Sequence, residues 1–139
     1  MSTSFQAQCP CGEVTVQIRG AALGQVYCHC DDCQNAHGAA YVPRSIHQRT
    51  DVTIASGNTT EWTNVTRTMV MCSSCGSHLY SEHETSPFRG VNAGNFPAER
   101  FSPTMHLHCK FAVAGVIDNL THFQDVPEEF GGTGELADW

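Results

Sequence analysis

Seven of the eight cysteines in this chain fall into three short clusters, and this grouping limits what the chain can fold into. The clusters are Cys9-Pro-Cys11-Gly12, Cys28-His-Cys30-Asp-Asp-Cys33 and Cys72-Ser-Ser-Cys75-Gly76. Four thiolates complete a tetrahedral zinc site, whereas three leave one coordination position open. Two pairs and one triplet therefore predict one closed, structural zinc site and one open, reactive site.

Glycine placement distinguishes the two kinds of cluster. Cys11 and Cys75 are each followed directly by glycine, Gly12 and Gly76. Glycine tolerates the positive φ of a tight turn whose backbone N–H groups point at ligand sulfurs. The two glycine-terminated clusters are therefore predicted to share one structural zinc and to contribute folding free energy through it. Its ligands would be Cys9, Cys11, Cys72 and Cys75.

The middle cluster, Cys28, Cys30 and Cys33, runs into a predicted helical turn, and a helix N-terminus favours thiolate. Three thiolates on a dication leave a net charge near −1, so this zinc would be a poor Lewis acid for making hydroxide. It is better suited to binding a soft thiolate as its fourth ligand. The cluster therefore predicts a catalytic-type zinc and indicates a thiol substrate.

Several alternatives remain open for these residues. Cys72 and Cys75 have the C-x-x-C spacing of a redox motif, although the expected strand–helix setting is missing. The second zinc could also be closed, and hence structural, with Cys109, His29 or His37 as its fourth ligand. His29 should point away from a metal that both its neighbours face. His37 could share the metal-facing side of the helical turn, and Cys109 is expected to be a small buried hydrophobe.

Composition restricts the remaining possibilities. The chain is 40% hydrophobic, carries a net charge of −7, and has no long apolar run or secretory signal. One domain over residues 1–139 is predicted, with a core over about 5–123 and an acidic, loosely packed tail over 124–139. We expect a cytoplasmic protein with reduced thiols. Its seven scattered Lys and Arg residues argue against a nucleic acid partner, and no membrane partner is expected. A small-molecule substrate fits better, and the oligomeric state is left open.

Alternating apolar and polar residues predict short strands and little helix. The strands are expected at 13–19, 51–55, 67–71, 77–81 and 106–113. A hairpin is predicted from Thr53 to Trp62 through Ser56-Gly57-Asn58. Helical turns are expected from Asp31 or Asp32 to His37, ending at Gly38, and at 98–101. The fold class is therefore mainly β, braced by metal.

The strings CPCGE, CHCDDCQNAHG and MCSSCGSHLY, in this order, closely resemble the glutathione-dependent formaldehyde-activating enzyme (GFA) family, which includes centromere protein V. Weaker matches follow in RGVNAGNF and HLHCKFAVAGVIDNLTHF, and the resemblance covers residues 5 to 123. It implies a zinc-braced β-tent of short antiparallel strands with two zinc ions.

The resemblance also implies site roles and a reaction. The structural zinc falls on Cys9, Cys11, Cys72 and Cys75, and the catalytic-type zinc on Cys28, Cys30 and Cys33. The family's reaction joins glutathione and formaldehyde into S-hydroxymethylglutathione, which is a carbon–sulfur lyase reaction run in reverse. The alternative function is a non-catalytic, zinc-braced β module that binds a protein partner.

Overall fold

The computed structural model describes residues 3–139 and confirms that the chain is mainly β. Within that range it contains eleven short strands, one α-helix and five 3-10 helices. The chain divides into two compact units, which we describe separately. Unit 1 comprises the residues up to Gly24 together with Ser45–Phe101, and unit 2 comprises Gln25–Arg44 and Ser102–Trp139. The single domain expected from the sequence stays a prediction.

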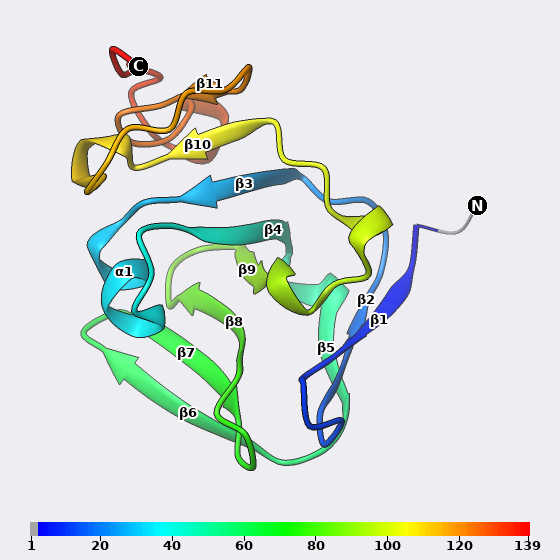
Figure 1. The fold of residues 1–139 in the computed structure, drawn as a ribbon. Coiled ribbons are helices and arrows are strands. Elements are labelled where there is room, and N and C mark those ends of the chain that lie inside the picture. Colours follow the sequence, from blue (N-terminus) through cyan, green and yellow to red (C-terminus); the bar gives the residue numbers. More distant parts are fainter. Residues whose placement is uncertain (1–2) are drawn as a thin grey trace. The chain divides into compact units, whose positions relative to one another are not determined.

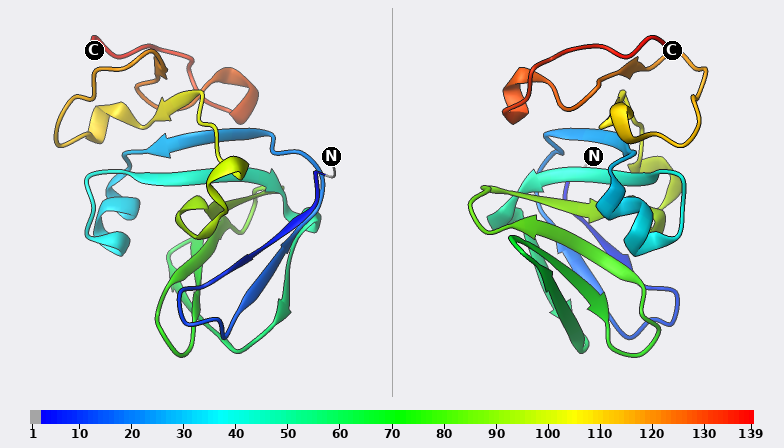
Figure 2. Two further views of the ribbon diagram at one scale, coloured as in Figure 1. Left: turned by 45° about the vertical axis from the view of Figure 1, so that its right-hand side comes forward. Right: turned by 90° about the vertical axis from the view of Figure 1, so that its left-hand side faces the viewer.

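Unit 1 contains most of the strands (Figures 1 and 2). Its strands are β1 (Phe5–Gln8), β2 (Thr15–Ile18), β5 (Val52–Ser56), β6 (Thr59–Asn64), β7 (Arg67–Cys72), β8 (His78–His83) and β9 (Phe88–Asn92). Its 3-10 helices are η1 (Arg49–Asp51), η2 (Ala93–Asn95) and η3 (Ala98–Arg100). Strand β4 (Val42–Gln48) begins in unit 2 and ends in unit 1.

The strands of unit 1 pair antiparallel. β1, β2 and β5 form a three-stranded sheet in that order, with Ile18 opposite both Phe5 and Val52. β6, β7, β8 and β9 are neighbours in chain order. The predicted Thr53–Trp62 hairpin is wrong, because β5 pairs with β2 whereas β6 pairs with β7. A Cβ atom on Gly57 would clash with the backbone of Glu13, which lies just before β2. The turn at Gly57 therefore packs against the segment that leads into β2 and does not close a hairpin.

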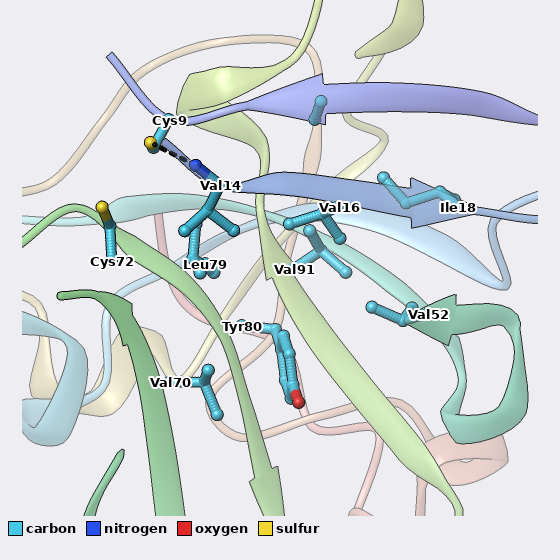
Figure 3. Close-up of a cluster of buried hydrophobic side chains, with 11 residues drawn as sticks. Cys9, Val14, Val16, Ile18, Val52, Val70, Cys72, Leu79, Tyr80 and Val91 are labelled. Atoms are coloured by element: carbon cyan, nitrogen blue, oxygen red, sulfur yellow. Dashed lines mark hydrogen bonds between the residues drawn. The ribbon is translucent and has the colours of Figure 1, made fainter. Parts of the chain in front are cut away.

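The hydrophobic core of unit 1 lies between these strands and includes two cysteines, Cys9 and Cys72 (Figure 3). Its buried members are Ala7, Cys9, Val14, Val16, Ile18, Val52, Val70, Cys72, Leu79, Tyr80 and Val91. The β-branched residues suit the pleated strand surface, and alternation directs them to one side. Because Cys9 and Cys72 belong to this core, whatever they bind is tied to the packing of the unit.

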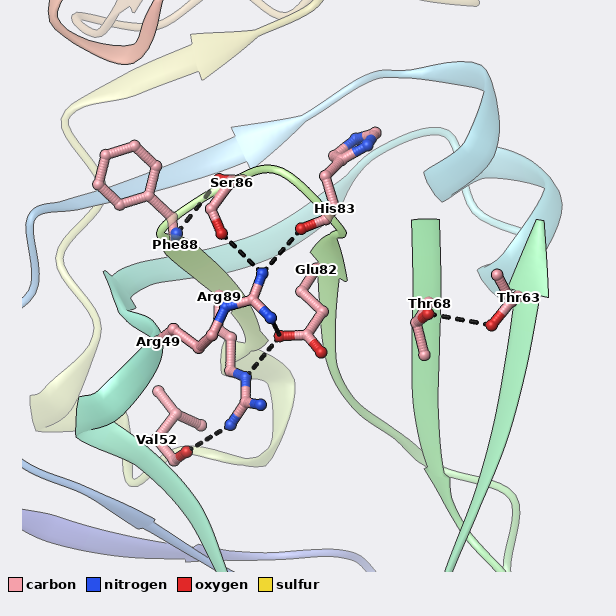
Figure 4. A network of polar contacts seen from close by, with 9 residues as sticks. All are labelled: Arg49, Val52, Thr63, Thr68, Glu82, His83, Ser86, Phe88 and Arg89. Atoms are coloured by element: carbon pink, nitrogen blue, oxygen red, sulfur yellow. Dashed lines mark hydrogen bonds and ion pairs between the residues drawn. The ribbon is translucent and has the colours of Figure 1, made fainter. Parts of the chain in front are cut away.

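A network of ion pairs and hydrogen bonds connects three strands of the same unit (Figure 4). The carboxylate of Glu82 lies 3.1 Å from Arg49 Nη1 and 2.8 Å from Arg89 Nε. Arg89 also donates to the Val52 carbonyl at 2.7 Å, and Arg49 donates to the Ser86 carbonyl at 2.6 Å. One carboxylate therefore positions two arginines that link β5, β8 and β9.

Unit 2 contains the helix and the parallel strands. Its elements are β3 (Gly24–Cys28, whose first residue belongs to unit 1), α1 (Asp31–His37), β10 (Met105–Leu107), η4 (Cys109–Phe111), β11 (Thr121–His122) and η5 (Glu128–Phe130). β10 pairs in parallel with β3 on one side and with β11 on the other. The sequence did not predict these parallel pairings.

Helix α1 forms where the sequence predicts it. Cys30 is its N-cap, its first turn contains Asp31 and Asp32, and Gly38 ends it in the left-handed conformation at φ 59°. The acidic residues complement the positive end of the helix, and glycine adopts this φ without steric cost. The predicted turn at 98–101 is present as η3.

The strand predicted over 106–113 is shorter than expected. β10 ends at Leu107, because His108 adopts a left-handed φ of 57° and the chain turns into η4 at Cys109. The tail also differs from the loose extension expected. Its backbone is hydrogen-bonded to the preceding part of unit 2, from His108 N to Asp125 O at 2.7 Å and from Ala137 N to His122 O at 2.8 Å. None of the helices in residues 3–139 has the length and apolar character needed to cross a membrane.

Candidate metal centres

The four cysteines of the two glycine-terminated clusters meet in unit 1. We call Cys9, Cys11, Cys72 and Cys75 the four-thiol cluster. Cys9 directly follows β1 and Cys72 ends β7, so the sheet positions one sulfur of each pair. The Cys11 and Cys72 sulfurs come from positions 61 residues apart and lie 3.7 Å from each other. The cluster therefore joins distant segments of the unit, as the sequence indicated.

The sulfur spacing fits a tetrahedral metal. Cys9 Sγ lies 3.5 Å from Cys11 Sγ, and Cys11 Sγ lies 3.7 Å from Cys72 Sγ. Zinc–sulfur bonds of about 2.3 Å in a tetrahedron place sulfurs about 3.8 Å apart. All eight cysteines are free thiols. The arrangement thus suits a four-coordinate metal ion and forms no disulfide.

Backbone geometry supports the same cluster. The Val14 amide donates to Cys9 Sγ at 3.3 Å (Figure 3), and the Cys75 amide donates to Cys72 Sγ at 3.4 Å. Gly12 and Gly76 adopt φ values of 78° and 74°, the positive values predicted from the sequence. Amide donors stabilise negative charge on sulfur, so the turns are shaped to hold thiolates.

The thiols of this cluster cannot all ionise by themselves. Burial raises the pKa of Cys9, but the Val14 amide and the neighbouring thiols outweigh it and lower that pKa to about 6. The Glu13 amide lowers the pKa of Cys11, but Cys9 and the other thiols outweigh it and raise that pKa to about 12. Ionising one thiol thus suppresses ionisation of its neighbour. A bound cation would remove this conflict by compensating the added negative charge.

The second group lies in unit 2 and contains three buried thiols. We call Cys28, Cys30 and Cys33 the three-thiol cluster. Cys28 ends β3, Cys30 caps α1, and Cys33 lies in the first turn of that helix. The Cys33 amide donates to Cys30 Sγ at 3.3 Å. The ligand atoms of the cluster lie within 4.8 Å of one another, and no other histidine, cysteine or acidic ligand atom of the described residues joins them.

A buried arginine compensates charge in this cluster. Hydrogen bonds from the Cys28 and Cys30 thiols, together with Arg44, hold the pKa of Cys33 below its ordinary value. The Cys30 and Cys33 sulfurs, together with burial, raise the pKa of Cys28 well above its ordinary value. The Cys28 thiol lowers the pKa of Cys30, but Cys33 and burial outweigh it and raise that pKa, so the thiolate is favoured at Cys33 and not at the N-cap of α1. Alone, the cluster favours one thiolate and two thiols, and a dication would allow three thiolates.

The candidate fourth ligands lie elsewhere. His29 points away from the three-thiol cluster, as expected, and its Nε2 lies 2.8 Å from His106 Nδ1. His37 Nε2 lies 3.1 Å from Arg44 Nη2, beside the cluster and outside it. Cys109 is buried, as expected, and burial raises its pKa to about 11. The closed alternative proposed from the sequence therefore has no support from His29, His37 or Cys109.

Sequence reasoning missed a third group of possible ligands. His106, Asp118 and His122 bring one ligand atom each within 4.8 Å of one another in unit 2. The Asp-x-x-x-His spacing of Asp118 and His122 was visible in the sequence, but bringing this pair to His106 requires the register of β10 and β11.

Comparison with known proteins places these centres in context. Residues 4–111 match the model of a family described as glutathione-dependent formaldehyde-activating enzyme. The matched span contains both cysteine clusters and ends before Asp118. A comparison with curated proteins finds no match. The fold resembles the crystal structure of a Rhodobacter sphaeroides protein at 21% identity and a TM-score of 0.56, over 68% of this chain and 89% of that one. At this identity the likeness concerns the fold alone.

Proposed function

Because the chain belongs to the glutathione-dependent formaldehyde-activating enzyme family, we propose that it is a zinc-dependent carbon–sulfur lyase. Its substrates would be a glutathione-like thiol and a formaldehyde-like aldehyde, which it joins or separates in a cytoplasmic, reducing compartment. The four-thiol cluster would hold a structural zinc ion and the three-thiol cluster a second one. The observation that supports this division is the number of converging ligands, four in one cluster and three in the other.

The reaction is balanced without an oxidant or a reductant. The thiol sulfur forms a bond to the aldehyde carbon, the carbonyl π bond breaks, and the thiol proton ends on the new hydroxyl oxygen. The product is an S-hydroxymethyl adduct, and its cleavage is the lyase direction. When bound, zinc lowers the pKa of a thiol ligand and so increases the fraction of nucleophilic thiolate at neutral pH.

The chain's own residues support thiol binding at the three-thiol cluster. Three buried cysteines provide a soft, anionic set of ligands that suits a fourth thiolate better than a hard oxygen ligand. Arg44, only 4% exposed, places its guanidinium 3.7 Å from Cys33 Sγ. A fixed cation at this position offsets the negative charge that a fourth thiolate would add. Burial of the cysteines also keeps water from the sulfur atoms.

The test is the rate of adduct exchange, because thiols and formaldehyde combine without a catalyst. Exchange between ¹³C-formaldehyde and its glutathione adduct would be followed by NMR exchange spectroscopy at increasing protein concentration. We expect the rate to rise with the zinc-loaded protein and to return to the buffer value with Cys30→Ala. Cys109→Ala is the matched control, since it removes a buried thiol outside both clusters and should keep the wild-type rate.

A protein that holds both metals yet leaves the exchange rate at its buffer value would contradict the proposal. That result would favour the alternative drawn from the sequence, a non-catalytic module that binds a protein partner.

A further inference from the structure

Two histidines meet on neighbouring strands of unit 2, outside both cysteine clusters. His106 on β10 is the register partner of His122 on β11 in a parallel pair. Their rings stack at a centroid distance of 4.6 Å and an angle of 29°. Both side chains are buried, His106 completely and His122 to all but 8%. The strand pairing therefore fixes two imidazoles side by side with little freedom to move.

A carboxylate completes the group. Asp118 Oδ2 lies 2.7 Å from His106 Nε2, and Asp118 Oδ1 lies 3.0 Å from His122 Nε2. The second contact lacks hydrogen-bond geometry, so the buried His122 Nε2 has no hydrogen-bond partner. A buried polar nitrogen without a partner is costly and needs an explanation. A hydrogen-bonded His–Asp pair would account for His106 but would leave His122 unexplained.

The spacing of these atoms suits a metal ion. Metal bonds of about 2.1 Å to nitrogen and oxygen place neighbouring ligand atoms about 3.0 Å apart in octahedral coordination and about 3.4 Å apart in tetrahedral coordination. The two histidine nitrogens lie 2.7 Å and 3.0 Å from the carboxylate oxygens, and the group stays within 4.8 Å. The Asp118 side chain is 29% exposed, so ions can reach the group from solvent.

Supporting contacts orient the ligands. His29 Nε2 lies 2.8 Å from His106 Nδ1, the nitrogen opposite the one that faces Asp118. The Leu120 amide donates to Asp118 Oδ1 at 3.0 Å and fixes the carboxylate. Trp139 packs on His122 at a centroid distance of 4.6 Å. A second partner on the far ring nitrogen is the usual support of a metal-binding histidine, because it fixes the ring and its tautomer.

We propose that His106, Asp118 and His122 form a third metal site, which binds a divalent first-row transition metal. Two imidazole nitrogens favour zinc, cobalt or ferrous iron over magnesium and calcium, which prefer oxygen ligands alone. Three protein ligands leave coordination positions for water or another small ligand. The site shares no ligand with the two thiol clusters, so its occupancy can be measured separately from theirs.

Cobalt(II) is the probe, and Trp139 is the reporter. The chain has two tryptophans, so Trp62→Phe leaves Trp139 alone. In this background, with both thiol clusters loaded with zinc, Co²⁺ should quench Trp139 fluorescence and saturate at one equivalent. Asp118→Asn and His122→Gln should each weaken binding at least about tenfold, because loss of an outer-shell partner alone costs 10- to 100-fold. Asp138→Asn, a nearby exposed carboxylate outside the group, should bind Co²⁺ like the parent.

Two variants keep the test decisive if one of them folds poorly, and near-ultraviolet circular dichroism checks the fold of each. Absence of saturable quenching in the parent, or equal Co²⁺ affinity in both folded variants, would overturn the assignment. So would quenching that arises only together with thiolate-to-cobalt charge-transfer absorption, because cobalt would then have entered a cysteine cluster. These readouts do not depend on adduct exchange, so the proposed function can fail while this site stands.

Discussion

Arg44 Nη2 lies 3.7 Å from Cys33 Sγ and 3.1 Å from His37 Nε2. A buried guanidinium therefore contacts the three-thiol cluster on one side and a half-buried histidine on the other. Buried charges are costly unless they are paired, and here the partner is a thiolate. This contact makes Arg44 the residue through which the cluster's charge is balanced.

Replacing Arg44 with methionine should weaken thiol binding without removing a metal ligand. A hydrogen bond to a charged group contributes about 1.5–3 kcal/mol, so the glutathione Kd should rise by about 10- to 100-fold. Titration calorimetry on zinc-loaded protein measures this change. Arg44→Lys keeps the charge without the planar fork and should show a smaller loss. An unchanged Kd for Arg44→Met would show that the arginine does not act on the bound thiol.

The two thiol clusters should respond to mutation in opposite ways. Cys75→Ala should abolish one metal and unfold unit 1, because structural zinc contributes about 10–16 kcal/mol, as much as a typical domain's whole stability. Cys30→Ala should lose the second metal and keep its fold, since this cluster lies within a short segment of unit 2. Metal content by mass spectrometry and unfolding by circular dichroism separate the two. A folded Cys75→Ala protein with full metal content would contradict the structural assignment.

Glu82 is expected to contribute to stability through its two arginines. Glu82→Gln removes the negative charge that faces Arg49 and Arg89, and both cations then lose their partner. Because Glu82 is 17% exposed, solvent compensates part of the loss, and we expect a cost of about 1–3 kcal/mol. Urea unfolding measures it, with Glu61→Gln on the exposed strand β6 as the control. Equal stability of the two variants would mean that the network adds nothing to unit 1.

Acid should destabilise unit 1 through His47. This side chain is buried beside Ser45, and burial lowers its pKa below 6.5, although Asp51 partly opposes the shift. The folded state therefore binds the proton more weakly than the unfolded state. Stability is complete above about pH 6.5 and falls as the pH decreases towards the lowered pKa, by at most about 1.4 kcal/mol per pH unit.

Comparing His47→Gln with wild type isolates this effect from acid release of metal. The free energy of unfolding of the variant should fall less steeply between pH 7 and pH 5. His83→Gln, at an exposed histidine of β8, is the control and should keep the wild-type slope. Identical slopes for wild type and His47→Gln would exclude His47 as the titrating group.

The sequence predicted the features that depend on local chemistry. Gly12 and Gly76 have the positive φ that their position after cysteine required, and Gly38 caps α1 as its place in the pattern indicated. The four-thiol cluster could be predicted because a closed zinc site needs four ligands, and the two glycine-terminated cysteine pairs supply that number. Such features need no knowledge of which strands pair.

The features that depend on strand pairing could not be predicted in this way. β5 pairs with β2 and not with β6, and period-two alternation does not encode the choice of partner. For the same reason the sequence did not indicate that His106 and His122 are neighbours, because their contact depends on the parallel register of β10 and β11. Arg44 is one of only seven Lys and Arg residues in the sequence. Its position beside Cys33 depends on where β4 lies relative to α1, which the sequence pattern does not predict.

The central claim is that the three-thiol cluster binds a metal with one position open to a thiol. ¹¹³Cd NMR tests it directly, because the cadmium shift depends on the number of sulfur ligands. In cadmium-loaded His122→Gln protein, the account predicts one resonance typical of four sulfurs and one typical of three. Adding glutathione should move only the second resonance to the four-sulfur range. Two four-sulfur resonances before glutathione is added, or a three-sulfur resonance that glutathione leaves in place, would contradict the account.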